Sequence, residues 1–183
     1  MIKHKVPHAS QHLHIKIKKW RSKACGIVCL AMLFEYFGKK ISPNEILKKG
    51  LKLNGYLENI GWRHKVLVEI AKHYDFMGKN LDWSEIDAKI AFRKTLIYLN
   101  KYPIMVSIHN SFNPSRGGHL VVLTKFNGKK VFYNDPDSYN VKNLAQSITL
   151  KKFLDGWKKR IIIIYPPADR KRPRYLGQNH AFG

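Results

Sequence analysis

The sequence predicts an α+β fold in which an N-terminal helical half precedes a C-terminal antiparallel sheet. Up to about residue 100 the apolar residues recur at helical spacing, whereas β-branched and aromatic runs separated by turn residues follow Pro103. Helices first and strands second are typical of α+β proteins rather than of alternating α/β proteins. The 183 residues are enough for one domain with a substantial core.

Helical periodicity and end signals define the expected helices of the first half. The expected ranges are 24–37, 42–50, 62–76 and 82–100. The first range is apolar on most sides and stops at Gly38, as a buried central helix would. Ser42-Pro43-Asn44-Glu45 has the pattern of a capping box with proline at the first helical position. A short strand is expected at 13–17, where apolar and polar residues alternate.

Four β-branched or aromatic runs define the expected sheet. They are 104–109, 119–126, 130–134 and 161–165. Asn127-Gly128 between two of these runs is a strong hairpin signal. A three-residue loop would pair Lys125 with Lys129, and the same register would place His119 opposite Asp135.

Composition limits the classes of function. Lys and Arg outnumber Asp and Glu by 34 to 12, which gives a net charge of +22. Such a charge favours polyanions such as nucleic acid, although a basic surface that only keeps the protein soluble explains it equally well. The longest uncharged apolar run, 27–34, is far shorter than the ~20 residues of a membrane span. Two free cysteines and the absence of a signal-peptide pattern favour the cytoplasm.

Cys25 is the strongest candidate nucleophile. It stands at the first turn of the apolar helix, where backbone N–H groups favour thiolate over thiol and can bind an oxyanion. Cys29, one turn further, is expected to pack in the core. The alternative for Cys25 is a structural thiol, because most cysteines at helix starts are structural.

A thiolate nucleophile needs a base, and His119 is the best candidate. It follows Gly117-Gly118 and begins an apolar strand, so its side chain can overhang a cleft. His109, at the end of another strand, is its rival. Asp135 is the candidate orienting acid, and a turn-forming Asp before Pro136 is the alternative interpretation. His4, His8, His12 and His14 lack compact ligand spacing, so no metal or other cofactor is expected.

The segments KACGIVCLAMLFEYFG, YPIMVSI, GGHLVVL and VFYNDPDSY resemble the bacteriocin-processing, double-glycine-leader peptidases and their stand-alone relatives. These are papain-like cysteine peptidases. The resemblance covers residues 11–166 and leaves 1–10 as an N-terminal extension and 167–183 as a basic tail. It implies a papain-like fold with Cys25 as the nucleophile, His119 as the base and Asp135 as the orienting acid.

One position departs from that family. Its members carry a glutamine six residues before the cysteine, whose amide binds the oxyanion, and this chain has Lys19 there. Lys19 or the Trp20 indole would take over that contact, whereas Gln11 is expected to lie too far upstream. The leading hypothesis is thiol-dependent hydrolysis of a peptide or isopeptide bond in a peptide or protein substrate. A catalytically silent peptide-binding module of the same fold and a basic nucleic-acid-associated protein are the alternatives.

Overall fold

A computed structural model describes residues 3–140, 142 and 144–168. The basic tail expected at 167–183 therefore lies almost entirely outside the described residues. The helices are α1 (Gln11–His14), α2 (Cys25–Tyr36), α3 (Pro43–Lys52), α4 (His64–His73), α5 (Ala88–Leu99) and α6 (Leu150–Gly156), with 3-10 turns η1 (Lys18–Trp20) and η2 (Asn110–Phe112). None of these helices is both long and apolar enough to span a membrane.

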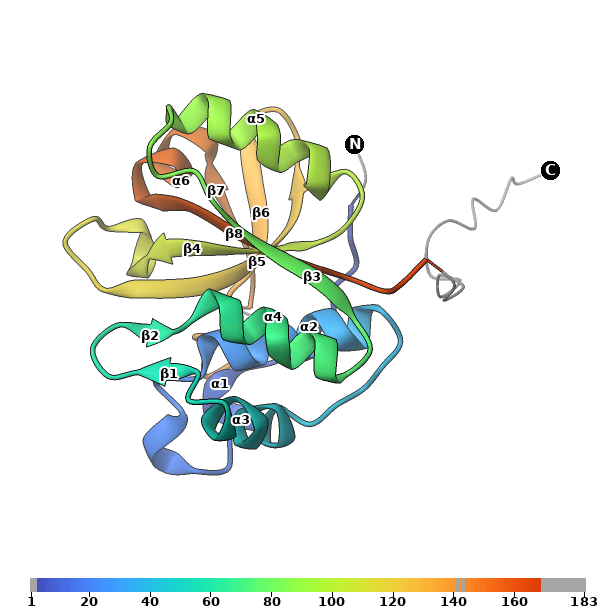
Figure 1. Ribbon diagram of the computed structural model, residues 1–183. Coiled ribbons are helices and arrows are strands. Elements are labelled where there is room, and N and C mark those ends of the chain that lie inside the picture. The colour runs from blue at the N-terminus through green and yellow to red at the C-terminus, as the bar shows by residue number, and fades with distance from the viewer. Residues whose placement is uncertain (1–2, 141, 143, 169–183) are drawn as a thin grey trace.

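The main sheet has six strands in the order β3-β8-β4-β5-β6-β7, and all neighbours are antiparallel. These strands are β3 (Met77–Asp82), β4 (Ile104–His109), β5 (Gly118–Phe126), β6 (Lys130–Asn134), β7 (Ala145–Thr149) and β8 (Trp157–Tyr165). A separate small hairpin pairs β1 (Tyr56–Leu57) with β2 (Gly61–Trp62). Figure 1 shows α5 and α6 above the sheet, and α1 to α4 with the small hairpin below it.

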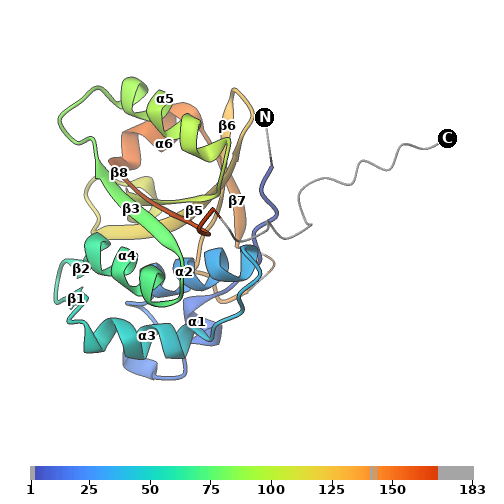
Figure 2. The same cartoon turned by 45° about the vertical axis from the view of Figure 1, so that its right-hand side comes forward.

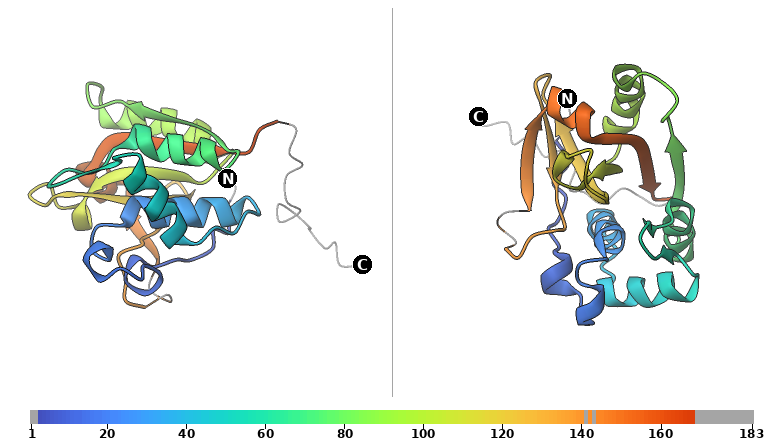
Figure 3. Two further views of the ribbon diagram at one scale, coloured as in Figure 1. Left: turned by 60° about the horizontal axis from the view of Figure 1, so that its bottom comes forward. Right: turned by 90° about the vertical axis from the view of Figure 1, so that its left-hand side faces the viewer.

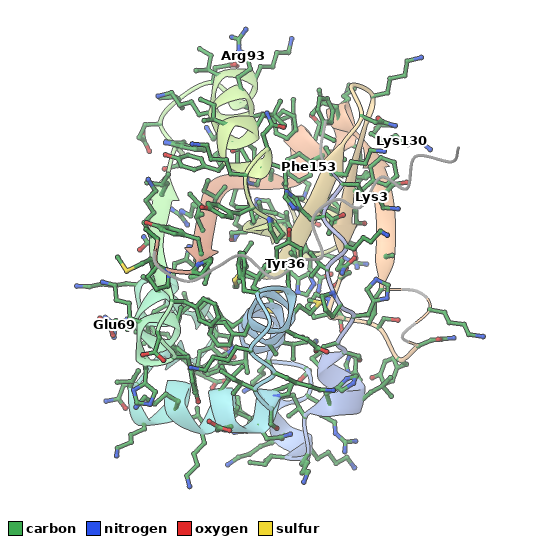
Figure 4. All side chains as sticks on the ribbon, turned by 90° about the vertical axis from the view of Figure 1, so that its right-hand side faces the viewer. Lys3, Tyr36, Glu69, Arg93, Lys130 and Phe153 are labelled. Carbon is green, nitrogen blue, oxygen red and sulfur yellow. The ribbon has the colours of Figure 1, made fainter. Side chains whose placement is uncertain are left out.

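Each face of the sheet contributes to its own core. Along β5, Leu120 and Val122 pack with the helices of the N-terminal half, whereas Val121 and Leu123 pack with α5 and α6. This alternation is the two-residue period of a strand that is covered on both faces. Figure 3 shows α2 between the sheet and α3, and nearly all of α2 is buried. In Figure 4, Phe153 lies inside the upper core and Arg93 points away from it.

The sequence-based elements are confirmed in the central part of the fold, and three of them need correction. The expected strand at 13–17 does not form: Ser10 caps the short helix α1, and no strand begins before Tyr56 among the described residues. The helix expected from residue 62 begins at His64 and ends at His73. Residues 77–82, which include the expected helix start at 82, instead form β3.

The segment that precedes α1 packs against the sheet. The backbone N–H of His4 donates to the carbonyl of Thr124 over 3.0 Å, and the side-chain amide of Asn134 donates to the carbonyl of Val6 over 3.2 Å. His4 itself is buried, and its imidazole contacts the carbonyl of Leu99. Figure 2 shows this segment running up beside β7. Residues 3–10 are therefore anchored to the body of the protein.

Candidate active site

Cys25 is the first residue of α2, and Ala24 before it supplies no side-chain cap. The N–H groups of the first turn keep their partial positive charge next to the sulfur, because no side-chain oxygen caps them. The side chain is half-buried and lines an open cavity of about 290 Å³. A substrate can therefore reach this sulfur, and the free N–H groups of the first turn can bind an oxyanion that forms next to it.

Cys29 has a different environment. Its sulfur is fully buried and donates to the carbonyl of Leu120 over 3.4 Å. Burial raises the pKa of the Cys29 thiol well above its usual value, so this thiol stays protonated and inert. Gly26 between the two cysteines is buried, and a Cβ there would lie 3.0 Å from side-chain carbons of Leu67 and Leu120. The glycine thus allows α2 to pack closely against β5.

His119 and Asp135 are in direct contact. Nε2 of His119 lies 2.7 Å from Oδ1 of Asp135, and only 6% of His119 is exposed. Cys25 also acts on this imidazole and raises its pKa, and Nδ1 is the ring nitrogen that is not bound to Asp135. The structure therefore brings together Cys25, His119 and Asp135, the three residues singled out from the sequence.

The contacts of His119 change its protonation. Burial alone would lower the pKa of this imidazole, but the hydrogen bonds to Asp135 and Cys25 outweigh burial and raise the pKa to about 10. For Asp135, burial raises the pKa, whereas the hydrogen bond and the charge of His119 lower it, and the net pKa lies below the usual value. At neutral pH the imidazole is therefore held as imidazolium beside a carboxylate.

The contact does not arise from the register that the sequence suggested. We expected His119 directly opposite Asp135, but β5 and β6 pair Val122 with Asn134, and their register shifts between Leu123 and Lys125. The turn lies further along the chain than expected, with Phe126 opposite Val131, so the predicted pairing was wrong by two residues. Asp135 is instead a diagonal neighbour of His119 on the same face, which is within reach of these side chains.

A second layer of hydrogen bonds holds Asp135. The backbone N–H of Asp137 donates to Oδ1 of Asp135 over 2.9 Å. The carboxylate of Asp137 in turn contacts Nε2 of Gln11 at 3.0 Å and Nε2 of His12 at 2.6 Å. The orienting acid is thus linked to the short helix α1 through one residue.

The same helix binds the neighbouring residues of that loop. The hydroxyl of Ser10 donates to the carbonyl of Ser138, and the backbone N–H of Gln11 donates to the carbonyl of Pro136 over 2.9 Å. The ring of His12 stacks on Tyr139 at 3.9 Å. We refer to the contacts of Ser10, Gln11 and His12 with residues 136–139 as the α1 clamp. The sequence analysis missed it, because no local pattern connects segments so far apart.

Lys19 and the rival base lie elsewhere. Lys19 is exposed in η1 and is not among the residues that line the cavity, and the neighbouring Trp20 packs edge-on against Tyr56. His109 is the last residue of β4 and pairs with Gly118, next to His119, but it does not line the cavity and its ring contacts the carbonyl of Arg116 at 3.1 Å. Neither residue is brought to the Cys25 sulfur by a described contact.

The cavity lies between the two halves of the molecule. Its lining residues come from β1–β2 and the start of α4, from β3, and from β4, β5 and β8. Figure 1 shows the small hairpin below the ends of β4 and β5. Within the described part of the chain, no group of three or more His, Cys, Asp or Glu residues is arranged to hold a metal ion. Beside Cys25 and His119, the lining includes a second imidazole, that of His64, and the charged side chains of Arg63, Asp82, Lys158 and Arg160.

A family model matches residues 3–161, which is most of the chain, and its description is the Peptidase_C39 like family. The chain belongs to this family. The match begins in the segment before α1 and extends through Cys25, His119 and Asp135 into β8. No curated protein matches the sequence of this C39-like chain.

Solved structures share the fold of this C39-like protein at low sequence identity. A double glycine motif protease from an AMS/PCAT transporter, in complex with a leader peptide, is 19% identical with a TM-score of 0.61, covering 90% of this chain and 94% of that one. A Bacillus anthracis protein described as a C39-like peptidase is 16% identical with a TM-score of 0.62, covering 92% and 96%. The Streptococcus ComA peptidase domain is 20% identical with a TM-score of 0.59, covering 79% and 93%. The fold is that of the papain-like C39 peptidases, as expected from the sequence.

Proposed function

We propose that this protein is a cysteine peptidase that hydrolyses a peptide or isopeptide bond through Cys25, His119 and Asp135. The observation that carries the proposal is the 2.7 Å contact between His119 and Asp135, with His119 lining the same cavity as the half-buried Cys25 at the start of α2. A thiol, an imidazole and a carboxylate in that order can perform acyl transfer without a metal or organic cofactor. Membership of the C39-like family agrees with this chemistry.

The reaction would proceed in two steps. The Cys25 thiolate attacks the carbonyl carbon, and the N–H groups at the start of α2 stabilise the resulting oxyanion. The tetrahedral intermediate collapses to a thioester as the His119 imidazolium protonates the leaving amine. Neutral His119 then removes a proton from water, which attacks the thioester, and the acid product leaves with regeneration of the thiolate–imidazolium pair. Asp135 keeps Nδ1 of His119 directed at the sulfur throughout.

A peptide is the proposed substrate class. The double glycine motif protease that shares this fold was solved with a leader peptide bound. The comparisons give no support to a nucleic-acid partner, so that alternative stays a prediction from the charge of +22 alone. A silent peptide-binding module is the other alternative, and thiol reactivity separates it from an enzyme.

The test is selective alkylation with a substoichiometric thiol electrophile near neutral pH. We expect the label on Cys25 and not on Cys29, whose sulfur is fully buried. Peptide hydrolysis should be lost in Cys25→Ala, while circular dichroism shows an unchanged fold. An unreactive Cys25 in a protein that still binds peptides would establish the silent module instead.

A further inference from the structure

An irregularity in β8 lies beside the candidate active site. Strand β4 pairs Ser107 with Arg160 but Ile108 with Trp157, so Lys158 and Lys159 are extra residues on β8. Lys159 has a φ of 57°, which a residue with a side chain rarely adopts. Bulges of this kind redirect side chains and are common next to active sites. This bulge determines where the two lysine side chains point.

The two lysines of the bulge have opposite environments. The ammonium of Lys159 donates to the carbonyls of Ser84 and Ile86, which anchors it beneath the end of β3. Lys158 instead lines the cavity. Its Nζ lies 3.4 Å from the position that a Cβ on Gly118 would occupy, and Gly118 immediately precedes His119. The bulge therefore presents one ammonium group beside the candidate base.

The charges that line the cavity are not balanced. The cationic residues of its lining are Arg63, Lys158 and Arg160, and the carboxylate of its lining is that of Asp82. Asp135 binds His119 and does not line the cavity. Nε of Arg160 binds Oδ2 of Asp82 at 2.7 Å, so those two charges compensate each other. Arg63 and Lys158 have no carboxylate partner among the described residues. The cavity thus keeps an unpaired positive charge.

His64 lines the same cavity, and burial and the positive charge both lower the pKa of its imidazole. Burial lowers the pKa of its imidazole most strongly, the charge of Arg160 lowers it further, and Lys158 acts in the same direction against the opposing effect of Asp82. The imidazole of His64 is therefore neutral at neutral pH and adds no charge of its own. It remains able to donate or accept a hydrogen bond from a bound group.

We propose that Lys158, assisted by Arg63, forms a carboxylate-binding subsite, so that the preferred substrates carry a carboxylate next to the bond that is cleaved. The inference rests on the proposed peptidase function and specifies the substrate class of the same site. The carboxylate belongs either to an acidic side chain or to the C-terminus of the peptide. An ammonium beside His119 would attract either group into the cavity and orient it toward the Cys25 sulfur.

Iodoacetate and iodoacetamide test this charge directly. They have nearly the same size and differ by one negative charge, and with each the Cys25 sulfur forms a bond to the methylene carbon as iodide leaves. The rate of Cys25 alkylation by each reagent is followed by mass spectrometry and divided by the rate of the same reagent with glutathione. The normalised rate with iodoacetate divided by that with iodoacetamide is the ratio to be compared. We expect Lys158→Met to lower this ratio about three- to ten-fold, the effect of one nearby charge in a partly solvated site.

Lys65→Met is the matched control, because Lys65 is exposed on α4 and does not line the cavity. It removes the same charge from the protein and should leave the ratio unchanged. An unchanged ratio in Lys158→Met, or an equal fall in both variants, overturns the subsite. Failure of iodoacetamide to alkylate Cys25 in the unmodified protein overturns the proposed function itself, and the subsite with it.

Matched peptides identify the source of the carboxylate. In the first pair, built around Gly-Gly, one peptide has Glu beside the glycines and the other has Gln. In the second pair, the chain ends at that position, in a free carboxylate in one peptide and in an amide in the other. A faster reaction of the Glu peptide assigns an acidic side chain, and a faster reaction of the free acid assigns a C-terminus. The preference should shrink in Lys158→Met. Equal rates within both pairs would contradict the subsite.

Discussion

At the scale of single residues, one oxygen of Asp135 accepts hydrogen bonds from both His119 and the backbone of Asp137. Asp135→Asn keeps the size of the side chain but removes the charge that favours imidazolium and fixes the ring. We expect single-turnover acylation of Cys25 to fall by about 10³–10⁴ while the circular dichroism spectrum is retained.

Two histidine variants identify the base independently. His119→Ala should abolish acylation, whereas His109→Ala should cost little, because His109 does not line the cavity and its ring contacts a loop carbonyl. The comparison uses two strand histidines of the same sheet. A larger loss in His109→Ala would assign the base to that residue.

Lys19 remains a proposed oxyanion donor that the described contacts do not place. If its ammonium binds the oxyanion, Lys19→Ala should lower acylation by about 10²–10³ with little change in substrate binding, and Lys19→Gln should restore it. The Lys19 side chain is exposed, so the alternative is that it is a surface charge with no part in acylation. Unchanged acylation in both variants would leave the oxyanion to the N–H groups of α2.

Local pattern was sufficient for some residues and not for others. Cys25 and His119 were predictable because each begins an apolar element, at a helix start or after paired glycines. Lys158 was not, because its position depends on a bulge whose partner strand, β4, lies far away in the sequence. The contacts of Asp137 likewise depend on α1, a helix that was not expected and whose last two residues were assigned to a strand at 13–17.

At the scale of elements, the α1 clamp is the feature whose effect on activity can be measured. His12→Ala removes the 2.6 Å contact with Asp137, which holds the residue that binds Asp135. We expect acylation to fall about 10- to 100-fold, as for a small displacement of a reacting group. His12→Gln, which can still donate to Asp137, should restore much of the rate.

The control for the clamp is His8→Ala. His8 is exposed in the same segment and makes no side-chain hydrogen bond in the described structure. If the clamp positions the acid, the pH profile of acylation should change in His12→Ala and not in His8→Ala. Identical profiles in both variants would reduce the clamp to a purely structural contact.

Within the main sheet, the strands that were not expected from the sequence are its two edges. β3 and β7 are mostly exposed and mostly polar, so they lack the apolar runs that identified the interior strands. Their extended form comes from pairing with β8 and β6. Strands that are buried on both faces were found because their runs are apolar, as in β4 and β5.

At the scale of the whole molecule, the stability should depend on pH through His119. Its pKa of about 10 in the folded state lies above the ~6.5 of an unfolded chain. The folded state then binds the extra proton, so the contribution is complete below about pH 6.5 and is lost as the pH rises to about 10. Urea unfolding between about pH 8.5 and 10 should show a falling free energy of unfolding.

The slope of that fall identifies its source. His119→Ala should show a shallower decline over the same range, whereas His109→Ala should keep the slope of the unmodified protein. Burial raises the pKa of Cys29 and of Tyr133 in the folded state, so these groups titrate over this range only in the unfolded chain, and both are present in all three proteins. Equal slopes in the three proteins would contradict a strongly raised pKa of His119.

The candidate triad comes from two separate parts of the fold. Cys25 starts a helix packed against one face of the sheet, whereas its two partners extend from the strands. During synthesis the cysteine emerges long before His119 and Asp135 exist as parts of a sheet. On the proposed function, Cys25 of the nascent chain has neither the imidazole nor the carboxylate beside it, and the three groups meet only once the halves have docked. Folding itself would then act as the activation step, which protects the ribosome and neighbouring chains during synthesis.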